Sequence, residues 1–321
     1  KETKRPDVMV NSYPDIDIIL IAFNHESFII PAVESILFQE YPGRVRVIVA
    51  DDASTDATVS IIEETVKNQN RVQFDVLPPT RNLGITKNYE RAFSAATADY
   101  VAVLEGDDYW ASSKKLLKQV EFLQEHRECA ACGCNYYIKD AAQFSHKLRI
   151  DATNGLMVVT PQILIGDNLI GNFSTCMYRK AALQSLPKKL FSVKSYDWIT
   201  NICVAMHGPI GILFEPLSVY RVHAEGTWNT MDAHKKLSSQ LETLPIYNEV
   251  TEGHFEDEFE ELGERLLAQI ACVSGSRSPL SYVKIAVAGL LPSSILRPLQ
   301  SLYRKIAPRP SVVRSTKLQS C

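Results

Sequence analysis

The sequence has little cysteine, glycine or tryptophan and almost no excess of charge. Its 321 residues include 7 Cys, 14 Gly and 3 Trp. These low counts exclude a disulfide-dense scaffold and a collagen-like or low-complexity chain. Basic residues (34) nearly balance acidic ones (37), which leaves a net charge of −3 and excludes a dedicated nucleic-acid-binding protein. With 45% hydrophobic residues, the chain can form one large globular domain or two ordinary ones.

Long apolar runs are also missing. No stretch of about 18 apolar residues occurs, so the sequence predicts neither a signal sequence nor a membrane-spanning helix. The odd number of scattered cysteines predicts free thiols in a reducing, cytoplasmic compartment. Cys129 and Cys132 form a C-x-x-C pair, but no second Cys or His pair follows at zinc spacing. We therefore interpret them as small residues of a buried strand.

The charge is unevenly distributed along the chain. Residues 281–321 hold seven basic residues and no acidic residue, which gives them a net charge of +7. Because the whole chain has a net charge of −3, residues 1–280 have a net charge of −10. Apolar residues accompany the basic ones in 283–288 and 295–306. Two interpretations of this tail stay open. It is either a peripheral contact with anionic lipid at the inner face of the plasma membrane, or an ordinary packed helix or self-association surface.

Apolar runs alternate with helix-period stretches over the first 140 residues, which predicts a parallel sheet with crossover helices. Strands are expected at 16–22, 45–50, 72–77, 100–104 and 128–137. Helices are expected at 56–66, 86–96 and 113–125, after a first helix with Ile30, Val33 and Leu37 on one face. Further along, the pattern predicts strands at 174–178, 210–214 and 217–222, a helix at 196–206 and an acidic helical stretch at 248–271.

Polar clusters follow three of the expected strands. They are Phe23-Asn24-His25, Asp51-Asp52-Ala53-Ser54 and Glu105-Gly106-Asp107-Asp108. Ligands of open parallel sheets bind beyond the carboxyl ends of the strands, so these clusters predict a ligand site. Each cluster alone is also consistent with turn or cap chemistry. A helix start capped by Ser54 or Asp56 would explain the second cluster, but not Asp51.

The third cluster is typical of a divalent cation site. Glu105 and Asp107 can both reach one cation, which keeps part of its coordination shell for water and substrate phosphate. Gly106 between them would let a diphosphate approach the backbone. Without a cation or hydrogen-bond donors, three neighbouring acids would repel one another. A plain turn is the alternative.

Four more residues have a functional and a structural interpretation. The carboxylate of Asp51 can accept the imino N–H of a uracil-type ring. Arg81 would meet phosphate or base, or lie in a surface loop. Asp197 at an expected helix start either interacts with the helix dipole or faces the ligand site. His223 is either a structural histidine or a metal ligand.

The order of these motifs resembles that of the family-2 glycosyltransferases, which are inverting enzymes with the GT-A fold. The corresponding segments, within residues 15–228, are Ala22-Phe23-Asn24, Asp51-Asp52-Ala53-Ser54-Thr55-Asp56, Asn82-Leu83-Gly84, Glu105-Gly106-Asp107-Asp108, Asp197-Trp198 and Tyr220-Arg221-Val222-His223. Three positions depart from the family pattern. Ala53 replaces a glycine, so a turn without positive φ is expected. Glu105 replaces an aspartate, and Ala22 stands where a threonine is frequent.

The resemblance implies an α/β fold of the GT-A type: a Rossmann-like, mostly parallel central sheet flanked by helices, with a helical C-terminal extension. Residues 1–14 would be an N-terminal extension and 15–228 the glycosyltransferase domain. That domain would consist of a nucleotide-binding part (15–140) and an acceptor-binding part (141–228). Residues 229–321 would form the helical region with the basic tail.

The resemblance also implies a metal-dependent transfer of a sugar from a nucleotide-sugar, with a UDP-sugar favoured. The acceptor would be a hydroxyl of a glycan or lipid-linked glycan, in the synthesis of cell-surface polysaccharide such as capsule or O-antigen. Asp107, with Glu105 and His223, would bind Mn²⁺ or Mg²⁺, and Asp197 would be the catalytic base. The residues implied in nucleotide binding are Ala22, Phe23, Asn24, Asp51, Asp52, Arg81, Gly84, Gly106 and Asp108.

Other functional classes fit less well. A nicotinamide dehydrogenase needs a glycine-rich turn after the first strand, and residues 22–26 contain no glycine. A nucleotidyltransferase would have a glycine-rich loop with a basic residue near the same strand, which is also missing, so this alternative is less favoured. A phospho-receiver domain would explain little after residue 140. A catalytically silent sugar-nucleotide-binding relative stays open.

Overall fold

A computed structural model describes residues 13–78, 81–140, 145–193, 197–223 and 231–274. The chain falls into two compact units, residues 1–230 and 231–321, which we treat separately. The basic tail predicted to contact lipid or a partner lies outside the described residues.

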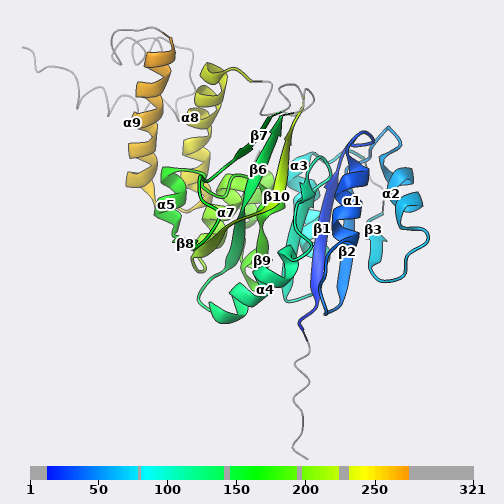
Figure 1. The fold of residues 1–321 in the computed structure, drawn as a ribbon. Helices are drawn as coiled ribbons and strands as arrows, with labels where there is room; N and C mark the ends of the chain where they lie inside the picture. Colours follow the sequence, from blue (N-terminus) through cyan, green and yellow to red (C-terminus); the bar gives the residue numbers. More distant parts are fainter. Residues whose placement is uncertain (1–12, 79–80, 141–144, 194–196, 224–230, 275–321) are drawn as a thin grey trace, which may run out of the picture. The chain divides into compact units, whose positions relative to one another are not determined.

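In the described part of the first unit, ten strands form one sheet (Figure 1). Its main path is β3-β2-β1-β4-β9-β6-β10-β5, with β7 added to β6 and β8 to β10. The strands are β1 (Ile16–Ala22), β2 (Val45–Asp51), β3 (Gln73–Val76), β4 (Tyr100–Glu105), β5 (Tyr109–Trp110), β6 (Ala131–Asp140), β7 (Ser145–Leu148), β8 (Leu156–Val159), β9 (Met177–Arg179) and β10 (Ile210–Val222). The longest registers, β1–β2, β1–β4 and β6–β10, are parallel.

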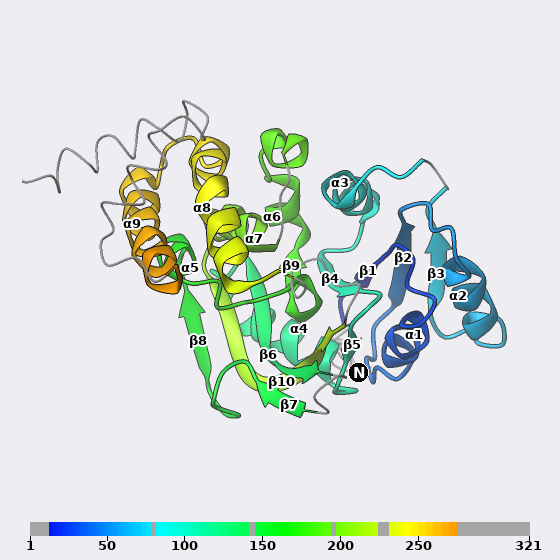
Figure 2. The ribbon, with the colours of Figure 1, turned by 90° about the horizontal axis from the view of Figure 1, so that it is seen from above.

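Helices cover both faces of this sheet, and Figure 2 shows α1 and α3 on opposite sides of β1 and β2. The helices are α1 (Ile29–Leu37), α2 (Thr58–Val66), α3 (Ile85–Ala95), α4 (Lys115–Glu125), α5 (Pro161–Gly166), α6 (Lys180–Gln184) and α7 (Asp197–Ala205), with short 3₁₀ turns η1 (Phe173–Thr175) and η2 (Lys188–Ser192). All seven residues of β1 are buried because both faces are covered, as in other doubly covered parallel sheets. The predicted α/β fold with a mostly parallel sheet is confirmed.

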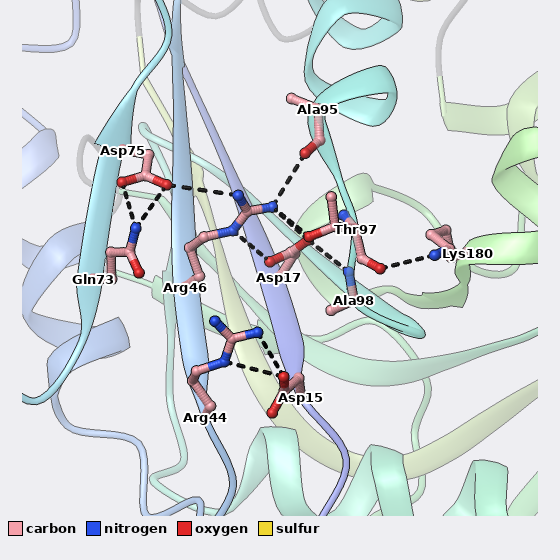
Figure 3. A network of polar contacts seen from close by, with 10 residues as sticks. All are labelled: Asp15, Asp17, Arg44, Arg46, Gln73, Asp75, Ala95, Thr97, Ala98 and Lys180. Atoms are coloured by element: carbon pink, nitrogen blue, oxygen red, sulfur yellow. Dashed lines mark hydrogen bonds and ion pairs between the residues drawn. The ribbon is translucent and has the colours of Figure 1, made fainter.

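A buried ion pair lies at the amino ends of β1 and β2 (Figure 3). Both oxygens of Asp17 accept hydrogen bonds from the guanidinium of Arg46 at 2.8 Å, and the backbone N–H groups of Thr97 and Ala98 donate to the same carboxylate. Burial alone would raise the pKa of Asp17, but the bonds from Arg46, Ala98 and Thr97 outweigh it and lower the pKa. The pair joins β1, β2 and the turn before β4.

Asp17→Asn is expected to lower the free energy of unfolding by about 3 kcal/mol at neutral pH, because it leaves the Arg46 charge without its buried partner. Folding lowers the pKa of Asp17. The wild type therefore has the full stabilisation by the ion pair at pH values above the pKa of Asp17 in the unfolded chain. It loses that stabilisation as the pH falls through the lower pKa of Asp17 in the folded protein. Urea unfolding between pH 3 and 7 measures both effects. The matched control is Asp15→Asn, in an exposed pair with Arg44, which should change stability little. Equal losses in the two variants would contradict the prediction.

Two local predictions are wrong here. Of the residues predicted on the buried face of α1, Val33 is buried and Leu37 packs against the core, but Ile30 is 44% exposed, and Ile29, Ala32 and Ile36 are buried instead. The two strands expected at 210–214 and 217–222 are one strand, β10, with register shifts around Pro216. Because proline cannot donate a ladder hydrogen bond, it interrupts pairing here without ending the strand.

The second unit contains α8 (Ala233–Val250) and α9 (Glu256–Val273) within its described residues. The helix predicted at 248–271 is therefore interrupted, by a turn in which Glu252 and Gly253 have positive φ. Acidic residues of α9 lie mainly on its exposed face, whereas Phe259, Leu262 and Leu266 are buried. Among the helices described in either unit, none is long and apolar enough to span a bilayer. All six cysteines that the structure describes are free.

Candidate active site

The parallel register brings the three polar clusters together. Ala22 at the end of β1 is opposite Asp51 at the end of β2, and Ile21 is opposite Glu105 at the end of β4. The clusters that follow these strands therefore share the carboxyl edge of the sheet, as the sequence predicts. The buried Ala22 also accepts a hydrogen bond from the backbone of Asp52, and the next residue, Phe23, is 42% exposed.

Hydrogen bonds join the loop after β1 to the loop after β2. The backbone N–H of Asn24 donates to the hydroxyl of Ser54 at 2.8 Å, and the side-chain oxygen of Asn24 accepts from the backbone of Thr55 at 2.8 Å. The backbone N–H of His25 donates to the hydroxyl of Thr58 at 2.8 Å. The first two clusters thus form one rigid unit.

Asp51 and Asp52 both organise this edge of the sheet. The Asp51 carboxylate accepts hydrogen bonds from the backbone N–H of Ser54 at 2.9 Å and from its hydroxyl. Asp52 accepts from the N–H groups of Leu83 and Gly84 at 2.8 and 2.9 Å, and so holds the turn before α3. Neither Ser54 nor Asp56 is the N-cap residue of α2, which is Ala57, although Asp56 accepts from the N–H of Thr58. Arg81 is exposed in the loop before that turn.

The turn at Ala53 differs from the prediction. The sequence predicts a turn without positive φ, but Ala53 has φ 61°. The bonds from Ser54 to Asp51 fix the turn on one side, and the pairing of the Asp52 N–H with Ala22 fixes it on the other. These contacts hold Ala53 in a conformation that costs an L-residue about 1–2 kcal/mol.

Ala53→Gly is therefore expected to raise the free energy of unfolding by about 1 kcal/mol, because glycine adopts positive φ without steric cost. Ala57→Gly is the matched control, since Ala57 has φ −81° and gains nothing from a glycine there. Urea unfolding of both variants measures the difference. A destabilised Ala53→Gly protein would contradict the prediction.

Two histidines face the carboxylate of Asp107. Nε2 of His223 lies 3.3 Å from Oδ2 of Asp107, and Nε2 of His25 lies 4.0 Å from the same atom. Burial would raise the pKa of Asp107, but the hydrogen bond with His223 and the neighbouring imidazoles outweigh it and lower the pKa. His25 is a residue for which the sequence predicted no role. Its position directly after the first motif, in a cluster at a strand end, was the available signal.

Gly106 is required by the packing of that histidine. A Cβ at this position would lie 2.7 Å from Nδ1 of His25 and 2.8 Å from Cδ1 of Ile29. From the sequence, this glycine is expected to let a diphosphate approach the backbone. The structure supplies a second reason, close contact with the loop after β1.

Glu105 and Asp108 have partners within the protein. Tyr89 donates a hydrogen bond to Glu105 at 3.0 Å. Asp108 is 1% exposed and accepts from the hydroxyl of Ser174 at 2.7 Å and from the backbone of Arg221 at 3.0 Å. Burial, followed by the charge of Asp107, raises the pKa of both carboxyls. Their contacts make them parts of the framework around Asp107.

Asp197 begins α7 and belongs to the same electrostatic environment. Its carboxylate accepts a hydrogen bond from Nδ2 of Asn168 at 3.0 Å. Burial raises the pKa of Asp197 to about 6, against the opposing effect of that bond and of backbone N–H groups at the helix start. The charge of Asp197 also contributes to the raised pKa of Glu105, together with those of Asp107 and Asp108. The charges of Asp107, Asp108 and Asp197 therefore all raise the pKa of the buried carboxyl of Glu105.

Asp107 and His223 are placed so that both could be ligands of one divalent cation. Metal–ligand distances of about 2.1 Å at right angles separate two ligand atoms by about 3 Å, close to the 3.3 Å between Asp107 Oδ2 and His223 Nε2. Nδ1 of His223 is buried without a hydrogen-bond partner in the described residues, so Nε2 is the nitrogen available to a ligand. Within those residues no group of three or more His, Cys, Asp or Glu could hold a metal ion. Phosphate oxygens and water would complete the shell.

Comparisons with known proteins agree with this architecture. TarS residues 1–349 of S. aureus, solved in complex with UDP-GlcNAc, align with 91% of this chain and 92% of their own length at 16% identity and a TM-score of 0.53. The mannosyltransferase PcManGT from Pyrobaculum calidifontis, solved with GDP-Man and Mn²⁺, covers 92% of this chain and 89% of its own length at 17% identity and a TM-score of 0.53. The fold is therefore that of the GT-A glycosyltransferases.

The sequence model described as Glycosyl transferase family 2 matches residues 17–186. This chain belongs to that family. It is similar to the uncharacterized protein Rv1520 of Mycobacterium tuberculosis, at 33% identity over 67% of this chain and 61% of Rv1520. The Escherichia coli protein WfaP, a UDP-Glc:α-D-GlcNAc-diphosphoundecaprenol β-1,3-glucosyltransferase, is 30% identical over 39% of this chain and 47% of WfaP. The matches span less than two thirds of the length of these relatives.

Proposed function

We propose that this chain is a metal-dependent inverting glycosyltransferase that moves a sugar from a nucleotide-sugar, favouring a UDP-sugar, to an acceptor hydroxyl. The observation that carries the proposal is that Oδ2 of Asp107 and Nε2 of His223 lie 3.3 Å apart beyond the carboxyl edge of the sheet. This pair could bind a cation, and Asp197, whose pKa burial raises to about 6, would be the separate carboxylate that serves as base. Family membership and the UDP-GlcNAc complex of TarS support the choice of donor.

Each group has a defined task in the proposed reaction. The bond between the anomeric carbon and the diphosphate oxygen breaks, and its electron pair leaves with the nucleoside diphosphate. The acceptor oxygen attacks from the opposite face, and its proton passes to Asp197, which is ionised at neutral pH. Asp107 and His223 would hold Mn²⁺ or Mg²⁺, which as a Lewis acid neutralises charge on the leaving diphosphate. Glu105, which accepts a hydrogen bond from Tyr89 at one carboxylate oxygen, would be a further ligand through its other oxygen.

The nucleotide would lie along the loops after β1, β2 and β4. Asp51 is the proposed partner of the uracil N–H, and the exposed Phe23 the proposed contact of the nucleoside. Asp52 and Gly84 would shape the loop that carries Arg81, while Asn24 and Gly106 would fix the backbone near the diphosphate. Residues 141–228 would bind the acceptor. WfaP acts on a lipid-linked acceptor, and we extend that class, in surface-polysaccharide synthesis at the cytoplasmic face of the plasma membrane, to this chain.

The test is release of nucleoside diphosphate from a panel of UDP-, GDP- and dTDP-sugars, with Mn²⁺, Mg²⁺ or EDTA. Metal-dependent release from one donor class, and inverted anomeric configuration of the product by NMR, are expected. Binding of a nucleoside diphosphate without release or transfer, with any offered glycan acceptor, would instead identify a catalytically silent relative.

A further inference from the structure

Arg221 contacts both loops that bring side chains together at Asp107: the loop after β1, which carries His25, and the loop after β4, which carries Asp107 itself. Its guanidinium donates to the backbone carbonyl of Phe28 at 2.7 Å, of Gly106 and Asp108 at 3.3 Å, and of Asp107. Its own backbone N–H donates to the carboxylate of Asp108 at 3.0 Å. Arg221, near the end of β10, therefore joins that strand to the loop after β1 and to the loop after β4.

Two aromatic rings hold this guanidinium in place. Its central carbon lies 5.1 Å from the ring centre of Phe28 and 5.5 Å from that of Tyr109, distances at which a cation is attracted to a ring. The ring of Phe28 also packs against His223, with ring centres 4.3 Å apart. The side chain that orients Arg221 thus also orients a proposed cation ligand.

These contacts determine the geometry of the proposed cation-binding pair. His223 follows Arg221 by two residues and comes directly after β10, and His25 precedes Phe28 by three residues in the loop after β1. The carbonyls of residues 106–108 all point to Arg221, which fixes the backbone from which the Asp107 side chain extends toward His223. A planar guanidinium can bind several carbonyls at fixed angles, whereas a lysine ammonium is a flexible point charge.

We propose that Arg221 is a positioning residue that sets the spacing of Asp107 and His223 for a cation bound to the donor diphosphate. The inference rests on the proposed function. Arg221 touches neither the sugar nor the acceptor in this scheme; it acts through the backbone of the acidic loop.

Arg179 offers a matched control at the opposite edge of the sheet. Its guanidinium also donates to three backbone carbonyls, those of Leu123, His126 and Cys129, and lies 5.7 Å from the ring centre of Tyr100. Arg179→Met and Arg221→Met therefore remove the same kind of contact, and only the second lies at the proposed site.

The experiment measures UDP binding by titration calorimetry with and without Mn²⁺, donor kcat/KM and the melting temperature. Arg221→Met is expected to weaken Mn²⁺-dependent UDP binding by about 10–100-fold, a usual effect of losing an outer-shell partner of a metal ligand. UDP binding in EDTA should not change. Arg221→Lys should lie between this variant and the wild type, and tests the proposal even if Arg221→Met does not fold. Arg179→Met should lower the melting temperature about as much as Arg221→Met does. Its Mn²⁺-dependent affinity for UDP should nevertheless stay within about threefold of the wild type.

Two results would overturn the assignment. One is equal weakening of UDP binding with and without Mn²⁺. The other is loss of binding in Arg221→Met and Arg179→Met in proportion to their melting temperatures. If the wild type itself shows neither Mn²⁺-dependent binding of UDP, GDP or dTDP nor sugar transfer, the proposed function fails, which is a different outcome from failure of Arg221 alone.

Discussion

Asp197→Asn is expected to lower kcat by about 10²–10⁴-fold and to leave Mn²⁺-dependent binding of the nucleoside diphosphate unchanged, because a general base contributes about that much to rate. The amide has nearly the shape of the carboxylate and can still contact Asn168, so the start of α7 should stay intact. Steady-state transfer assays and calorimetry on the same protein measure the two effects. Transfer at the wild-type rate would show that another group accepts the proton.

The pH dependence gives an independent test of the same assignment. Since burial raises the pKa of Asp197 to about 6, the base is ionised at pH 7 and protonated below pH 6. Wild-type kcat/KM should therefore fall about tenfold per pH unit below 6. In Asp197→Asn the residual rate should lack this acid limb. Asp167→Asn is the matched control, because Asp167 is an exposed neighbouring acid paired only loosely with Arg149 at 3.6 Å, and it should keep the wild-type profile.

The sequence predicted those parts of the fold that depend on the local pattern of apolar residues along the chain. The β-branched run at 16–22 and the runs at 45–50 and 100–104 are buried on both faces of the sheet, so each appears as a continuous apolar stretch that few other structures would produce. Because parallel strands end at the same edge, the position of each acid cluster after its strand was enough to predict that Asp51 and Asp107 share that edge. These predictions needed no knowledge of long-range contacts.

Features that depend on contacts between distant segments could not be predicted in this way. The hydrogen bond that Tyr89 of α3 donates to Glu105 joins two segments that no local pattern connects. The positive φ of Ala53 follows from hydrogen bonds that Asp51 and the end of β1 impose on a residue that disfavours this conformation. His25 faces Asp107 because the loops after β1 and β4 pack together. These loops are about 80 residues apart in the sequence, so no local pattern predicts the contact.

The electrostatics of the acidic loop lead to a second large effect. The charge of Asp107 raises the pKa of both Glu105 and Asp108, whereas the hydrogen bond with His223 and the neighbouring imidazoles lower the pKa of Asp107 itself. Asp107 is therefore the acid of residues 105–108 that is ionised most readily, and the one best suited to bind a ligand of opposite charge. Removing Asp107 should therefore affect function far more than stability.

Asp107→Ala is accordingly expected to lower donor kcat/KM by at least about 10²–10³-fold, the usual effect of removing one group that stabilises charge in the transition state. Mn²⁺ should no longer tighten UDP binding, because the pair with His223 is broken. The melting temperature should fall by no more than about 2–4 °C, the shift expected for the loss of one contact worth about 1 kcal/mol in a domain of this size. Asp99→Ala, at an exposed acid outside the site, is the control and should keep both properties. A variant in which Mn²⁺ still tightens UDP binding as in the wild type would exclude Asp107 as a cation ligand.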